Sequence, residues 1–116
     1  MNIFKQQAEF MRACDQTVGE YNEAQAIMYS TLIMEEFEEL IQAETAAEGI
    51  KELMDLIVVL VGYGHSAGWD IESAWQEVWE SNMSKIDPVS GKVLKREDGK
   101  VLKGENYKPA DVAKYV

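Results

Sequence analysis

Two pairs of carboxylates stand in the sequence at positions where apolar side chains would be expected. Glu36 and Glu39 belong to a segment whose apolar residues repeat with a helical period, and Glu36 falls in the middle of its apolar stripe. Glu52 and Asp55 repeat the three-residue spacing in a second segment made mostly of Leu, Met, Ile and Val. Burying an unpaired carboxylate costs roughly several kcal/mol, so such a group is protonated, paired with a cation or bound to a metal.

Metal binding is favoured because cations are scarce in this part of the chain. Residues 1–84 contain 3 Lys or Arg against 16 Asp or Glu, whereas residues 85–116 contain 8 against 5. Acidic pairs on a helix are usually only solvated, but the stripe position and the second pair outweigh that interpretation. Hard oxygen ligands suit Mg²⁺, with Mn²⁺ as the alternative, and both ions also accept phosphate oxygens. The predicted metal ligands are Glu36, Glu39, Glu52 and Asp55.

The elements that must position these carboxylates are expected to be helices. Apolar residues recur at helical spacing, and Gly, Pro and capping residues separate the segments. The β-branched run 56–61 is compatible with a buried strand, but its surroundings favour a longer helix. The predicted fold is an all-α, four-helix bundle-type domain over residues 1–116, with a helical body at about 2–85 and an irregular basic tail at 86–116. Its expected helices are 2–17, 23 to about 47, 50–66 with Gly49 before it and Gly68 after it, and 70 to about 84.

Two further expectations concern the third helix and the tail. The helix at 50–66 is apolar nearly all round and must be covered on every side, which predicts a homo-oligomer, either a dimer or a dimer-of-dimers tetramer. In the tail, residues 92–96 and 100–103 flank Asp98-Gly99 and could pair as a small hairpin.

Composition excludes several classes of protein. A formal net charge of -10 argues against binding to nucleic acid, which needs a basic face. The sequence has no apolar run long enough for a membrane span and no signal-peptide pattern, so no membrane partner and a cytoplasmic location are expected. With one cysteine, Cys14, and one histidine, His65, a Cys/His zinc site is excluded.

The two carboxylate pairs also carry a family resemblance. Glu35-Glu36-Phe37-Glu38-Glu39-Leu40, followed by Glu52-Leu53-Met54-Asp55-Leu56, resembles the ExxE then ExxD signature of the MazG-like all-α nucleotide pyrophosphohydrolases. That superfamily includes MazG, phosphoribosyl-ATP pyrophosphohydrolase and the dimeric dUTPases. The resemblance covers most of residues 22–109 and continues through Gly68, Ser81-Asn82-Met83-Ser84-Lys85 and a tail that is similar to small MazG-like proteins of bacteria and phages.

The resemblance implies hydrolysis of a ribo- or deoxyribonucleoside triphosphate between its α- and β-phosphates, giving a monophosphate and pyrophosphate. It favours nucleotide pool control, with dGTP, GTP and dATP ranked ahead of pyrimidines, and leaves phosphoribosyl-ATP or dUTP as alternative substrates. For the base that activates water, Glu35 is the first candidate and Glu39 the second. The expected substrate contacts are Asn82 and Lys85 at the end of the fourth helix, and Lys100, Lys103 and Tyr107 in the tail.

Two other classes of protein compete with this enzyme. A ferritin-like di-iron protein needs Glu-x-x-His pairs, and the residue three positions before His65 is Gly62. A non-catalytic helical interaction module, in which the carboxylates are merely solvated, predicts no stabilisation by metal, whereas the enzyme predicts that Mg²⁺ with nucleotide raises the melting temperature.

Overall fold

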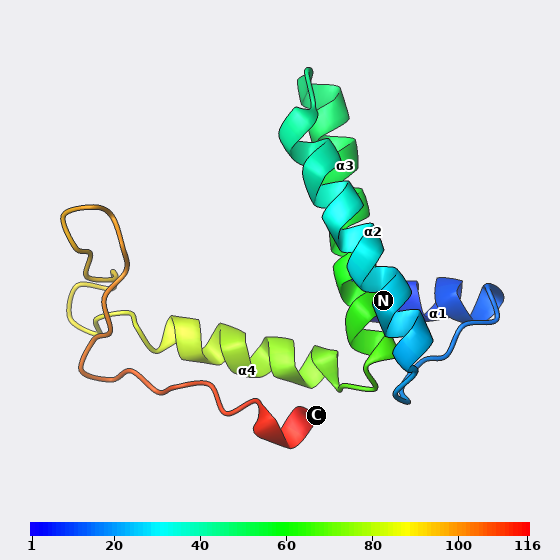
Figure 1. The fold of residues 1–116 in the computed structure, drawn as a ribbon. Coiled ribbons are helices and arrows are strands. Elements are labelled where there is room, and N and C mark those ends of the chain that lie inside the picture. Colours follow the sequence, from blue (N-terminus) through cyan, green and yellow to red (C-terminus); the bar gives the residue numbers. More distant parts are fainter. The chain divides into compact units, whose positions relative to one another are not determined.

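The computed structural model describes residues 1–116 and is all-α, which confirms the predicted fold class (Figure 1). The chain contacts group into an N-terminal unit, Met1–Ile71, and a C-terminal unit, Glu72–Val116. None of the helices combines the length and the apolar character needed to cross a lipid bilayer. In chain order the elements are α1 (Ile3–Ala13), α2 (Glu23–Gln42), α3 (Ala46–Ser66), α4 (Ile71–Met83) and the short 3-10 helix η1 (Ala113–Tyr115).

The boundary between α2 and α3 differs from the prediction. Helix α2 ends at Gln42 rather than near residue 47, and Gly49 lies inside α3 instead of before it. The reason is a cap, because the Thr45 side chain accepts a hydrogen bond of 3.1 Å from the backbone N–H of Glu48. Thr45-Ala-Ala-Glu48 fits the capping-box pattern, which fixes a helix start despite the nearby glycine.

Helix α1 is also shorter than the predicted 2–17 and ends at Ala13. The Gln25 side chain holds the backbone of Thr17, accepting from its N–H at 2.9 Å and donating to its carbonyl at 2.8 Å. Both backbone groups of Thr17 are therefore used by a side chain of α2, and the segment before Gly19 forms a loop.

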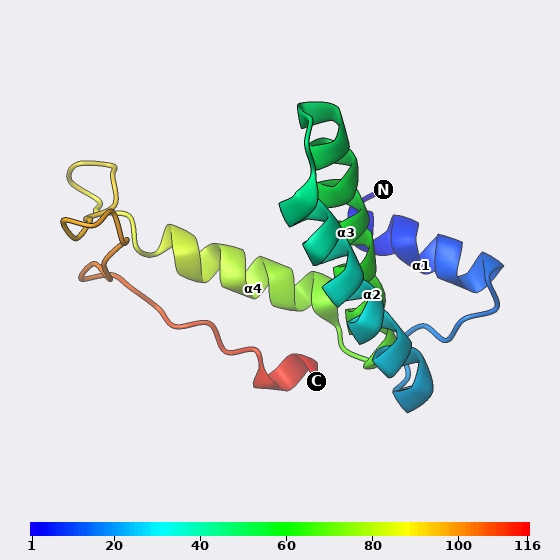
Figure 2. The same cartoon turned by 45° about the horizontal axis from the view of Figure 1, so that its top comes forward.

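Helices α2 and α3 lie side by side along their length, and α1 packs against α3 (Figures 1 and 2). Met11, Tyr29 and Val59, one from each helix, form the buried core of this unit. Helices α2 and α3 are in close contact at Gly62, because a Cβ atom there would lie 2.3 Å from the Tyr29 ring. The absence of a side chain at Gly62 therefore lets the aromatic ring of α2 rest on the backbone of α3.

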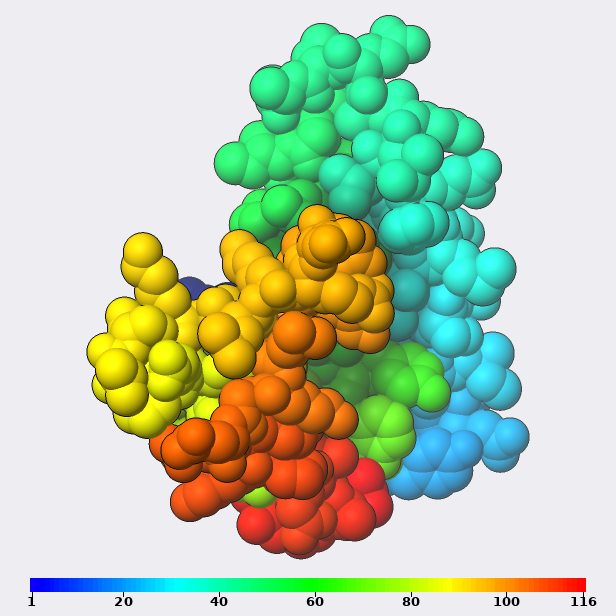
Figure 3. Space-filling model, turned by 90° about the vertical axis from the view of Figure 1, so that its left-hand side faces the viewer, coloured from blue at the N-terminus to red at the C-terminus, as the bar shows by residue number.

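The C-terminal unit consists of α4 and the segment that returns after it, coloured yellow to red in Figure 3. Isolated antiparallel bridges pair Ile86 with Val93 and Lys95 with Val101, so the predicted pairing of 92–96 with 100–103 is present in short form. Near the end of the chain, the backbone N–H of Asp111 donates to a carboxylate oxygen of Glu77 on α4 at 3.2 Å.

Candidate active site

Three of the four predicted metal ligands come together on the helical pair. Helix α2 supplies Glu36 and Glu39, and α3 supplies Glu52. One carboxylate oxygen from each residue can be chosen so that all lie within 4.8 Å of one another. Glu36 and Glu52 are half-buried and Glu39 is exposed, so the cluster lies at the edge of the helical interface and is open on one side.

Two oxygens of this cluster are buried without any hydrogen-bond partner. They are Oε2 of Glu36 and Oε2 of Glu52. Buried polar atoms nearly always have a partner, and a bound cation is a partner that suits carboxylate oxygens on two facing helices. Three hard oxygen donors converging from two helices fit a Mg²⁺ or Mn²⁺ ion, which takes its remaining ligands from water or phosphate.

The same crowding raises the pKa of two of these carboxyl groups, those of Glu36 and Glu39. Burial, and then hydrogen bonding with Glu52 and the charges of Glu39 and Asp55, raises the pKa of Glu36 to about 7. The pKa of Glu39 is also raised, first by its hydrogen bond with Glu52 and then by the charge of that residue. A divalent cation held by these carboxylates would offset their mutual repulsion.

Asp55, the fourth predicted ligand, lies beside the cluster and is engaged elsewhere. Its carboxylate forms an ion pair with Lys51 Nζ, one helical turn earlier on α3. Its charge still contributes to the raised pKa of Glu36. Lys51 is not among the residues predicted from the sequence, although its spacing of four residues to Asp55 is a recognisable helical ion-pair signal.

The remaining glutamates of the motif, Glu35 and Glu38, are exposed and lie outside the cluster. Glu35 is the first candidate for the catalytic base, and its charge is among those that raise the pKa of Glu39. Glu38 follows Glu36 by two residues, which puts it on the other side of the helix, and it accepts a hydrogen bond of 3.2 Å from Gln42 Nε2.

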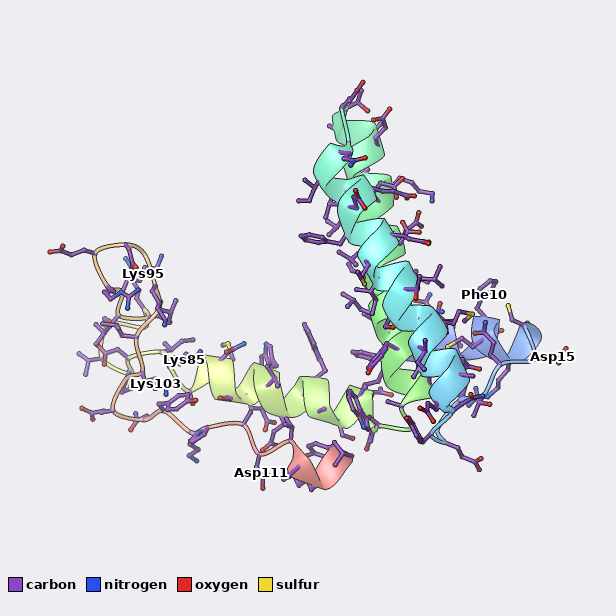
Figure 4. The ribbon with its side chains drawn as sticks, in the orientation of Figure 1. Phe10, Asp15, Lys85, Lys95, Lys103 and Asp111 are labelled. Carbon is purple, nitrogen blue, oxygen red and sulfur yellow. The ribbon has the colours of Figure 1, made fainter.

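Four of the five predicted substrate contacts lie together in the C-terminal unit. Lys85 Nζ donates to Asn82 Oδ1 at 3.2 Å and lies 5.9 Å from the centre of the Tyr107 ring. Lys103 Nζ lies 5.1 Å from the same ring centre, and Figure 4 shows Lys85 and Lys103 close together near the end of α4. Lys100 is not part of this group, because it lies at the turn where its N–H donates to Asp98 Oδ1 at 3.1 Å.

A pair of packed helices that each contribute carboxylates to one cluster is the arrangement expected of the MazG-like all-α pyrophosphohydrolases. The family model for phosphoribosyl-ATP pyrophosphohydrolase matches residues 6–82, about two thirds of the chain. The chain belongs to this family, which catalyses nucleotide pyrophosphohydrolysis and generally depends on a divalent metal. The matched segment contains all four motif carboxylates and ends at Asn82, before the tail. A search of curated proteins gave no match.

Proposed function

We propose that this protein is a metal-dependent enzyme that hydrolyses nucleoside and deoxynucleoside triphosphates between the α- and β-phosphates. The products are a nucleoside monophosphate and pyrophosphate, and the role is control of the nucleotide pool, with dGTP, GTP and dATP as preferred substrates. The observation that carries the proposal is the cluster of Glu36, Glu39 and Glu52, with its two orphaned buried oxygens, inside the segment that matches the family.

The carboxylates would hold Mg²⁺, and Asp55 joins them as a fourth ligand when its side chain leaves Lys51. A divalent cation bound there neutralises the charge of the triphosphate and favours in-line attack by water. Glu36 and Glu52, half-buried between the helices, fix the site, because their side chains have little freedom to move. Once Asp55 has left it, the Lys51 ammonium group at the exposed edge of the cluster would be able to pair with a phosphate oxygen.

The base that takes the proton of the attacking water is assigned to an exposed carboxylate of α2. Glu39 belongs to the cluster and is open to solvent, so its carboxylate can reach a water molecule beside the bound cation. Glu35 is the competing candidate and lies one residue before the first ligand. If Glu35 is the base, Glu35→Gln lowers kcat while metal binding is unchanged. Glu39→Gln impairs kcat and metal binding whichever of the two residues is the base.

Phosphoribosyl-ATP is a second candidate substrate, because the matching family model carries its name. Its triphosphate contains the same α–β phosphoanhydride bond, so the carboxylate cluster would perform the same reaction on it. Only the part of the molecule beyond the phosphates would differ.

A product assay tests both candidates. The purified protein is incubated with each common NTP and dNTP and with phosphoribosyl-ATP, in Mg²⁺ and then in EDTA, and the products are separated by chromatography. Monophosphate and pyrophosphate in equal amounts, abolished by EDTA, are expected. Diphosphate and orthophosphate would show that the wrong bond was assigned, and no turnover of any substrate would reject the proposed function.

We also propose that the enzyme works as a homo-oligomer. Met34, Phe37 and Ile41 lie along one side of α2 and are 72%, 55% and 68% exposed. Large apolar side chains in such a row are typical of surfaces that associate. Light scattering after gel filtration is expected to give a dimer or a tetramer, and Phe37→Lys should shift it toward monomer. A monomeric wild-type protein would contradict the proposal.

A further inference from the structure

Lys51 is the only lysine or arginine between Arg12 and Lys85, in a stretch that contains 15 Asp or Glu residues. Its ammonium group forms an ion pair with the carboxylate of Asp55, one turn later on α3. Asp55 is also the one proposed metal ligand that lies outside the group of converging oxygens. The single cation of this acidic stretch is therefore bound to the carboxylate that would serve as the fourth ligand of a metal ion.

The surroundings of Lys51 direct it to Asp55 rather than to another acidic residue. Glu48 lies one turn earlier on α3, but its Oε2 accepts a hydrogen bond of 2.9 Å from a backbone N–H in the connection between α2 and α3. The pKa of the ammonium group is raised first by the hydrogen bond to Asp55, and the charges of Glu52 and Glu36 act in the same direction. Lys51 therefore interacts with the carboxylate cluster as well as with its ion-pair partner.

Stabilising the helix is a weak explanation for this ion pair. The Lys51 side chain is 69% exposed and that of Asp55 is 33% exposed, and ion pairs at a protein surface contribute little to stability. A pair spaced by four residues is also more favourable in a helix when the acidic residue comes first, and here the lysine comes first. What distinguishes the pair is its place beside the carboxylate cluster, so its effect on ion binding matters more than its effect on α3.

A carboxylate that is paired with a lysine is less available to a metal ion. Asp55 must exchange the Lys51 ammonium group for the divalent ion, and that exchange costs the free energy of the ion pair. The ammonium group is tethered to α3, so it remains near the site and repels another positive charge there. One ammonium group cannot neutralise four carboxylates, so it weakens the binding of a divalent ion without preventing it.

We propose that Lys51 is a tethered counter-ion of the metal site, which binds Asp55 in the metal-free protein and lowers the affinity of the site for divalent ions. The inference rests on the proposed function in one respect, which is that the four carboxylates bind such an ion. Lys51 thereby regulates the site, because it raises the concentration of free metal at which the site fills. It also supplies positive charge beside crowded carboxylates when no metal is bound.

Calorimetric titration of the full-length protein with MnCl₂ at pH 8, in the absence of nucleotide, tests this role. Lys51→Met is expected to bind Mn²⁺ about threefold to tenfold more tightly than wild type, because it removes both the competition for Asp55 and the repulsion. Lys51→Arg keeps the charge and should bind Mn²⁺ no more tightly than wild type. Arg12→Gln removes a positive charge from α1, which carries none of the metal-site carboxylates, and serves as the matched control with unchanged affinity.

Two further measurements separate a counter-ion from a purely structural residue. In EDTA at pH 8, Lys51→Met should melt below wild type, because Asp55 loses its ion-pair partner. In a double-mutant cycle, the gain in Mn²⁺ affinity from Lys51→Met should be smaller in an Asp55→Asn background, where no ion pair competes with the metal. A gain of the same size in both backgrounds would overturn the exchange at Asp55.

The outcomes also distinguish this inference from the proposed function. If wild type binds Mn²⁺ and Lys51→Met binds it equally or more weakly, the counter-ion is overturned and the proposed function is unaffected. Tighter binding by Lys51→Met in a protein that hydrolyses no nucleotide keeps the counter-ion and rejects the proposed function. A wild-type protein that binds no Mn²⁺ overturns both.

Discussion

Replacing Glu36 by glutamine is expected to stabilise the metal-free protein while weakening metal binding. In the absence of metal, Glu36 is crowded by Glu39, Glu52 and Asp55, and its Oε2 has no hydrogen-bond partner. The glutamine side chain would have nearly the same shape as the protonated glutamic acid and would carry no charge. If Glu36 holds the metal as proposed, its carboxylate lowers the stability of the metal-free protein in return for metal binding.

The size of this effect follows from the pKa of Glu36, which is about 7 in the fold against 4.5 for an unperturbed glutamate. Well above pH 7, such a difference in pKa lowers the free energy of unfolding of the wild-type protein by at most about 3 kcal/mol. Solvent around this half-buried side chain reduces the loss to about 1–2 kcal/mol. For a chain of this size that predicts a rise in melting temperature of about 5 °C. Because folding raises the pKa of Glu36, its protonated carboxyl group contributes to the stability of the fold. That stabilisation is fully present below pH 4.5 and is lost as the pH rises through 7.

Thermal unfolding followed by circular dichroism measures this effect. In EDTA, Glu36→Gln should melt above wild type at pH 8 and close to it at pH 4, and added Mn²⁺ should stabilise wild type more than the variant. Glu38→Gln is the matched control, because Glu38 lies on the other side of α2, and it should change little at either pH. Glu36→Gln could instead melt below wild type in EDTA at pH 8, or its melting temperature could rise as much with Mn²⁺ as that of wild type. Either result would show that repulsion among these carboxylates does not destabilise the metal-free protein.

Three further predictions concern the helical pair. Asp55→Asn should lower kcat on the order of 100-fold or more with the fold intact, as measured by pyrophosphate release, and full activity would remove Asp55 from the site. Gly62→Ala should destabilise the protein by about 1–3 kcal/mol in urea unfolding, because its methyl group would overlap the Tyr29 ring, and an unchanged midpoint would contradict that contact. Thr45→Ala should cost about 1 kcal/mol in the same assay by removing the cap that binds the Glu48 N–H, whereas Thr45→Ser should keep most of the stability.

The helices could be predicted from the sequence more securely than their ends. The period of apolar residues gives the helix type over long segments, and all four expected helices are present. The predicted break between α2 and α3 is wrong because it relied on Gly49, although glycine is tolerated inside a helix that begins at a strong cap. The Thr45-x-x-Glu48 pattern carried the correct signal.

The carboxylate cluster was predictable because its geometry is local to each helix. The three-residue spacing puts Glu36 and Glu39 on neighbouring positions of one helix face. A carboxylate inside an apolar stripe needs a partner in the helix interface, because burying it alone is costly. The path of the chain after α4 was not predictable in this way. The segment around Tyr107 returns to the end of α4, where the Oγ of Ser84 accepts a hydrogen bond of 2.8 Å from the Lys108 N–H, and no periodic pattern encodes that return.

The contact between Gly62 and Tyr29 also bears on how this protein tolerates mutation. A metal ion at the proposed site would need its ligand distances met within about 0.2 Å, so the spacing of α2 and α3 would be part of the ligand geometry. A side chain at Gly62 that moves the Tyr29 ring by a few tenths of an ångström would widen that spacing about two to three turns away from Glu52. A screen for loss of activity should therefore select substitutions at a glycine that offers no side chain to substrate or metal. The most mutation-sensitive positions of the chain would then include residues in the interface between α2 and α3 as well as the acidic motif.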